Sequence, residues 1–240
     1  PEGCRNAGMN RVTYLEIQPF SMEQVERFIT NWYRMVELGE RVLAPSASLI
    51  KQADARSMHL LQSIREFPAL VALSVNPLLL TMVAIVHRFD GNLPQARVLL
   101  YQRIFALLLE HWDYGKGFSI ARKADDKLAV LRPLATHMMY QGVQELSVDS
   151  VLGIIAPHLG ASQTVLLEFL QSIQSSSGLL LEREAGVWSF AHLTFQEYLV
   201  ATHWAMQAPS EDDLRELTNQ ARWHETLRLY AGLDDCLRVN

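Results

Sequence analysis

The residue with the clearest chemical potential is His192, in the segment Phe190-Ala-His-Leu-Thr-Phe-Gln-Glu-Tyr-Leu-Val-Ala201. Thr194 and Glu197 have the spacing of a capping box, in which a hydroxyl and a carboxylate bind the first amides of a helix. This spacing predicts a helix that begins at Phe195, with His192 just ahead of its N-terminus. Amide donors and the helix dipole favour anions at such an end. An imidazole there can hydrogen-bond a phosphate and lose that contact when the segment moves, so we expect a switch residue rather than a catalyst.

Other patterns of reactive residues predict no catalytic or metal site. His192 and His203 would lie about three turns apart on one helix, which is too far for one metal ion. His224-Glu225 lacks the second histidine of the zinc motif H-E-x-x-H. The sequence also contains no G-x-x-x-x-G-K-S/T P-loop, whose amides and lysine would cradle phosphates. We therefore expect this chain not to hydrolyse ATP on its own.

The composition is that of a globular protein. Of the 240 residues, 49% are hydrophobic, which is enough for a substantial core. The net charge of −5, with acidic and basic residues intermixed, gives no general attraction to nucleic acid or anionic lipid. Cys4 and Cys236 stand at opposite ends without a C-x-x-C pattern, which favours a reducing, cytoplasmic compartment. The longest apolar run, Leu78 to Val86, is interrupted by Thr81 and is too short to span a membrane.

Periodicity predicts a mainly α fold. Alternation at residues 12–17 predicts a short strand, and Ser21 and Gln24 fit the N-cap and N3 positions of the helix that follows. Further helices are expected near Ser48–Glu66, after Pro68, at Leu78–His87 and at Gln95–Trp112. The glycines of Gly115-Lys-Gly117 predict a domain boundary.

Beyond this boundary the predicted elements follow the order of a winged helix. Three helices are expected at Ala124–Tyr140, Val148–Pro157 and Gln163–Ser175, before a β-hairpin at Leu179–Glu184 and Val187–Ala191. After the helix at Phe195, two more are expected, from Pro209 and from Arg222. The sequence thus predicts a helical domain followed by a winged-helix domain with one β-hairpin.

Several short motifs resemble NACHT-type STAND NTPases, which are signal-transduction proteins. Asn76-Pro-Leu-Leu-Leu-Thr81, with Leu93-Pro94, Leu100-Tyr101 and His111-Trp-Asp113, resembles their first helical domain. The segment from Phe190 to Ala201 resembles the end of their winged-helix domain, and Arg222-Trp-His-Glu225 is similar to the stretch that follows it. The opening Pro1-Glu-Gly resembles the end of their nucleotide-binding core, and the chain has no starting Met, so we expect a segment of a longer protein.

The resemblance implies a division into four parts. Residues 1–20 would be the edge of the NACHT core, with a short strand from a missing α/β core, and residues 21–115 the helical domain. Residues 124–208 would be the winged-helix domain, and residues 209–240 the start of a following helical domain.

The resemblance also implies nucleotide contacts for two residues. In the family, the proline that matches Pro77 packs against adenine, and the histidine that matches His192 contacts the β-phosphate of ADP. Each residue also has a simpler interpretation. Pro77 can be a helix breaker at the first position of a helix, and His192 can be satisfied by backbone at the hairpin exit. The implied cofactor is ADP or ATP, with Mg²⁺ in the parent protein, and both catalytic halves of the site would lie upstream.

The function implied is that of a regulatory module. It would control ADP/ATP-dependent switching and oligomerisation, in innate immune or antiviral defence. The implied partners are an upstream nucleotide-binding core and effector domain, a downstream sensor or repeat domain, and further copies of the protein. The alternative is a constitutive helical scaffold with a vestigial nucleotide pocket, and the nucleotide content of the purified parent protein would separate the two.

A winged helix also suggests DNA binding, but the charges argue against it. From Val143 to Glu182, which covers the expected recognition helix, the sequence has no Lys or Arg. Phosphate contacts supply most of the affinity for DNA, so this face should repel it. We expect neither nucleic acid nor membrane as a partner.

Overall fold

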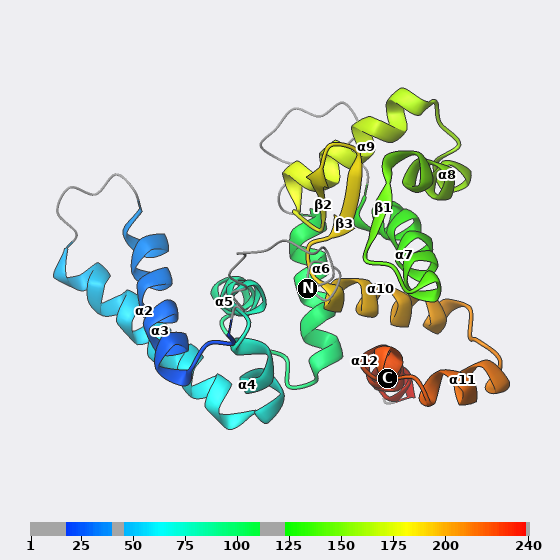
Figure 1. The fold of residues 1–240 in the computed structure, drawn as a ribbon. Coiled ribbons are helices and arrows are strands. Elements are labelled where there is room, and N and C mark those ends of the chain that lie inside the picture. Colours follow the sequence, from blue (N-terminus) through cyan, green and yellow to red (C-terminus); the bar gives the residue numbers. More distant parts are fainter. Residues whose placement is uncertain (1–17, 40–45, 111–122, 239–240) are drawn as a thin grey trace, which may run out of the picture. The chain divides into compact units, whose positions relative to one another are not determined.

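A computed structural model describes residues 18–39, 46–110 and 123–238, most of which are helical (Figure 1). They form two compact units, Pro1–Ala84 and Ile85–Asn240, which divide inside helix α5 (Pro77–Asp90). The predicted strand at 12–17 and the predicted glycine boundary at 115–117 lie outside the described residues. The prediction of a mainly α fold with a winged helix is confirmed.

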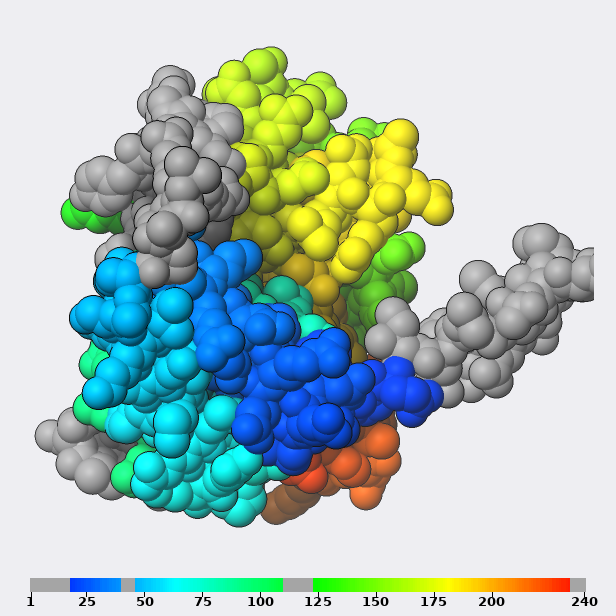
Figure 2. Space-filling view, turned by 90° about the vertical axis from the view of Figure 1, so that its left-hand side faces the viewer, coloured from blue at the N-terminus to red at the C-terminus, as the bar shows by residue number. Residues whose placement is uncertain are grey.

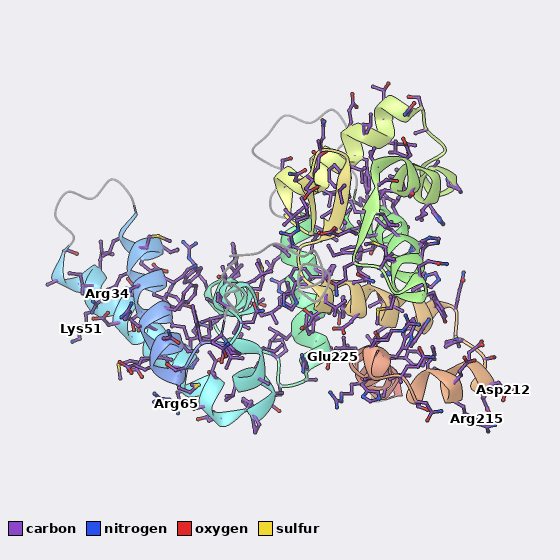
Figure 3. The ribbon with its side chains drawn as sticks, in the orientation of Figure 1. Arg34, Lys51, Arg65, Asp212, Arg215 and Glu225 are labelled. Atoms are coloured by element: carbon purple, nitrogen blue, oxygen red, sulfur yellow. The ribbon has the colours of Figure 1, made fainter. Side chains whose placement is uncertain are left out.

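The first unit is built on two long helices, α2 (Met22–Leu38) and α3 (Ala47–Glu66), which lie side by side (Figure 2). The predicted cap at Ser21 is confirmed, because its hydroxyl accepts from the Gln24 amide at 3.3 Å and the Gln24 side chain accepts from the Ser21 amide at 2.8 Å. The bidentate pair of Arg34 on α2 with Asp54 on α3 links the two helices on their exposed side. Arg34 is labelled in Figure 3. Helix α4 (Pro68–Ser74) then leads to α5.

The second unit contains the winged helix. Its elements are, in order, α6 (Arg97–Glu110), α7 (Ala124–Gln141), β1 (Glu145–Ser147), α8 (Val148–Leu159), α9 (Gln163–Ser176), β2 (Leu180–Glu184), β3 (Val187–Phe190), α10 (Leu193–Met206), α11 (Glu211–Thr218), a 3₁₀ turn (Ala221–Trp223) and α12 (His224–Arg238). The helix boundaries follow local signals. Ser147 caps α8 and Ser210 caps α11, while Gly142 ends α7 in the left-handed conformation that glycine adopts without strain.

The sheet has three strands rather than the two of the predicted hairpin. Its order is β1-β3-β2, with antiparallel pairing throughout. The short β1 has no alternating pattern long enough to identify it, and it becomes a strand because β3 supplies its hydrogen-bonding partners: Leu146 pairs with Trp188 and Ser147 with Val187. The hairpin turn between β2 and β3 passes through Gly186, whose φ of 75° favours glycine.

Helix α10 is the centre of the second unit. Every residue from Phe195 to Ala201 is buried, because α7 and α12 pack against it (Figure 1) and aromatic side chains of α6 contact it as well. The ring centroid of Phe105 on α6 lies 5.6 Å from that of Phe195 and 4.8 Å from that of Tyr198. A helix whose middle turns are buried on all sides needs no amphipathic stripe, and α10 has none.

None of the described helices is by itself long and apolar enough to cross a membrane. Helices α8 and α9 reach that measure only when taken together, and they bend by 102° at their junction. Within the described ranges, no three His, Cys, Asp or Glu side chains are grouped so that they could hold a metal ion.

Candidate functional site

His192 is itself the N-cap of α10. Its backbone is extended, with φ −148° and ψ 144°, and its ring Nδ1 accepts the amide hydrogen of Thr194 at 3.2 Å. The amide of Phe195 bonds the carbonyl of His192, so the helix opens at His192 and begins at Leu193. The predicted capping box of Thr194 and Glu197, with a helix beginning at Phe195, is therefore wrong. The imidazole satisfies the helix end that the threonine was expected to satisfy.

The contacts of His192 indicate which of its two ring nitrogens carries the hydrogen in the neutral ring. Its Nδ1 accepts the Thr194 amide and also lies 2.8 Å from the Thr194 hydroxyl, so the hydrogen of the neutral ring is on Nε2. The side chain is half-buried, and burial lowers the pKa of His192 below its usual value. Burial therefore disfavours the charged ring, and in the neutral ring the N–H donor is Nε2.

The His192 ring borders an open pocket of about 290 Å³ in the second unit. The polar side chains around it come from all three strands of the sheet or their ends and from the start of α10, and they are those of Gln144, Glu145, Arg183, Ser189, His192 and Gln196. The amide of Gln196 is itself anchored, since its Nε2 points to the Met139 sulfur at 3.7 Å. A neutral donor, a guanidinium and a carboxylate thus face the same space.

Arg183 reaches this pocket from a β-bulge. Leu181 pairs with Ser189, Glu182 with Trp188 and Glu184 with Val187, which leaves Arg183 as the extra residue of β2. Bulges bend a strand and redirect side chains, and they recur beside functional sites. The guanidinium donates from Nε to the Ser189 hydroxyl at 2.9 Å and from Nη2 to the Ala191 carbonyl at 3.4 Å, directly beside His192.

Pro77 lies in the first unit, and its position agrees with the simpler interpretation. It is the first residue of α5, where a proline loses no hydrogen bond. The Asn76 side chain caps this end, because it accepts the amides of Leu78 at 2.9 Å and Leu79 at 3.2 Å. The Pro77 ring is exposed, so it can also pack against a planar ligand. Pro77 and His192 belong to different units, and each site is described by itself.

Glu197 lies in the core of the second unit instead of at a helix cap. It is 6% exposed, and burial, with the nearby carboxylate of Glu225, raises its pKa to about 7, while Arg97 acts in the opposite direction. Arg97 of α6 and Glu225 of α12 form an ion pair at 3.1 Å, and Glu225 is labelled on α12 in Figure 3. The carboxyl group therefore sits where α6, α10 and α12 meet.

The comparison with known families identifies the domain that holds the pocket. Residues 97–204 match the family model described as the winged helix-turn-helix domain C-terminal to NACHT. This part of the chain is therefore similar to that domain. No curated protein matches the chain at a significant level. All the residues around the pocket lie inside the NACHT-associated winged helix, whereas Pro77 lies outside the matched range.

Sequence reasoning identified His192 but missed Arg183. The pairing of β2 with β3, and hence the bulge, depends on contacts that a local pattern does not reveal. One signal was available: Arg183 is the only Lys or Arg between Arg132 and Arg215. A lone cation in such a long stretch of sequence is a candidate for contact with an anion.

Proposed function

We propose that this chain is the regulatory module of a NACHT protein and controls switching between ADP and ATP. A NACHT core upstream of the chain would bind the nucleotide. His192 would contact the diphosphate of ADP, and the exposed ring of Pro77 would pack against its adenine. Exchange for ATP would break the His192 contact, release the winged helix and permit oligomerisation. Signalling in immune or antiviral defence is the setting that this family resemblance favours.

The position of His192 carries this proposal. The ring stands at the first turn of a helix, where amides and the helix dipole favour an anion, and it borders an open pocket. The Thr194 amide fixes its orientation, so Nε2 is its hydrogen-bond donor. A donor fixed in this way loses little conformational freedom when it binds a phosphate oxygen.

The contact need only be modest to act as a switch. A neutral hydrogen bond contributes about 0.5–1.5 kcal/mol, which corresponds to roughly a two- to tenfold change in an equilibrium. Coupling energies between sites in allosteric proteins are of similar size. One such bond, present in one nucleotide state and absent in the other, is enough to bias the switch.

Replacing His192 in the protein that carries its NACHT core tests the proposal. His192→Ala removes both the ring and the helix cap, whereas His192→Ser keeps a hydroxyl that can cap α10 but does not reach the pocket. We expect both variants to release bound ADP about two to ten times faster than the wild type and to raise basal activity. Only the alanine variant should also lower the melting temperature.

The measurement is the rate at which labelled ADP leaves the purified protein. Unchanged ADP release and a silent resting state in both variants would contradict the proposal. A wild-type protein that purifies without nucleotide would instead favour the constitutive scaffold with a vestigial pocket.

A further inference from the structure

Arg183 is far in sequence from every other Lys or Arg of the winged helix. It is the only Lys or Arg between Arg132 and Arg215, and it occupies the unpaired position of the bulge in β2. Arg183 is an exposed residue, and long exposed side chains are often free to move. This one is held, because it bonds the buried Ser189 and the carbonyl of Ala191, the residue that precedes His192.

These two bonds leave the guanidinium with further N–H groups that can donate hydrogen bonds. Arginine carries five N–H donors in a planar fork, and the bonds to Ser189 and Ala191 use two of them. Among the described residues, Arg183 forms no ion pair within 4.0 Å. A fork fixed by neutral acceptors keeps its full charge for a ligand and has already lost part of its side-chain freedom.

The charges around the pocket favour an anion that can take a bidentate contact. Arg183 is its only guanidinium or ammonium group, and burial disfavours the charged form of His192 by lowering its pKa. The opposing charge is Glu145, which pairs with Ser189 across β1 and β3, so Ser189 stands between the carboxylate and the guanidinium. Phosphate oxygens are the partners that match the geometry of the arginine fork, and a carboxylate beside them weakens binding.

We propose that Arg183 is a second phosphate ligand of this pocket and supplies positive charge beside His192. The inference rests on the proposed function, since the phosphates are those of the nucleotide held by the NACHT core. Arg183 binds the diphosphate with its outward N–H groups while Ser189 and Ala191 keep the fork in place. Glu145 opposes the same ligand and sets an upper limit on how tightly ADP is retained.

The test uses three variants of the protein with its NACHT core, loaded with ADP. Arg183→Gln should release ADP about tenfold faster, since a hydrogen bond to a charged group is worth more than a neutral one. Arg183→Lys keeps the charge but loses the fork and should fall between Arg183→Gln and the wild type. Glu145→Gln should slow the release, because it removes the opposing charge from the same pocket.

Ionic strength separates ligand binding from a purely structural role. Charge contacts are screened by salt, so ADP release from the wild type should accelerate with added salt more than release from Arg183→Gln. If Arg183 only ties the hairpin to the start of α10, Arg183→Gln lowers the melting temperature but leaves ADP release and its salt dependence unchanged. That result overturns the inference.

The same experiment distinguishes the two proposals. His192→Ser could release ADP faster while Arg183→Gln and Glu145→Gln have no effect. This outcome would show that Arg183 is not a phosphate ligand, and it would leave the proposed nucleotide switch unchanged. A wild-type protein that purifies without bound ADP would contradict both the proposed switch and the role of Arg183.

Discussion

Replacing Phe105 with alanine is expected to lower the free energy of unfolding of the second unit by about 3–5 kcal/mol. The ring is 2% exposed and lies between α6 and α10, edge-on to Phe195 and tilted against Tyr198. Truncation removes these contacts and leaves a cavity beside the buried middle of α10, where the neighbours have little room to relax. The measurement is urea unfolding followed by tryptophan fluorescence.

Phe89→Ala provides the matched control, because the same residue type is 53% exposed at this position on α5. We expect it to change the free energy of unfolding by less than about 1 kcal/mol, as surface substitutions usually do. Equal losses for the two variants would mean that the contact of α6 with α10 does not hold the second unit together.

Glu197→Gln is expected to remove a pH-dependent loss of stability. The raised pKa of Glu197, about 7 in the folded protein against 4.5 for the ordinary carboxyl, means that the fold favours the protonated group. Between about pH 4.5 and pH 7 the unfolded chain releases this proton while the folded chain keeps it, so the free energy of unfolding falls as the pH rises. A shift of this size corresponds to about 3 kcal/mol, lost across that window and not recovered above it.

The measurement is the free energy of unfolding at several pH values from 4 to 8, the interval that contains both pKa values. Glutamine has nearly the shape of the protonated carboxyl but cannot ionise, so its advantage over the wild type should grow up to about pH 7 and then level off. The exposed Glu168→Gln on α9 is the control and should keep the wild-type slope. Parallel profiles for wild type and Glu197→Gln would show that Arg97 compensates the buried carboxylate fully.

Much of the fold could be predicted because its signals are local. The caps of α2, α8 and α11 are serines whose side chains bond amides within the same turn. A glycine at position 142 ends α7 for the same kind of reason. The order of the helices and of the hairpin strands β2 and β3 in the winged helix follows from periodicities that each segment carries by itself.

The errors arose where distant residues decide the structure. Thr194 and Glu197 fit a capping box by spacing, but α6 and α12 enclose Glu197, and His192 takes the cap instead. The strand β1 exists because β3 pairs with it, and the bulge at Arg183 exists because β2 and β3 differ by one residue in length. Such features depend on pairing partners and not on the segment alone.

The candidate site also combines features that a local sequence pattern predicts with features that depend on distant residues. His192 was identified from a motif and a helix-end argument, both of which are local. The pocket around it joins side chains from β1, β2, β3 and α10, and only the folded sheet brings Arg183 beside the histidine. That Pro77 starts α5 was predictable from its residue type, whereas its nucleotide contact stays a prediction.

The burial of α10 restricts the motions that are open to the histidine at its start. A helix in contact with α6, α7 and α12 along its length cannot slide or rotate alone without breaking a tightly packed interior. The proposed switch would therefore displace His192 only together with these helices. The backbone torsions that change would then lie outside this packed group, so that its interior stays intact.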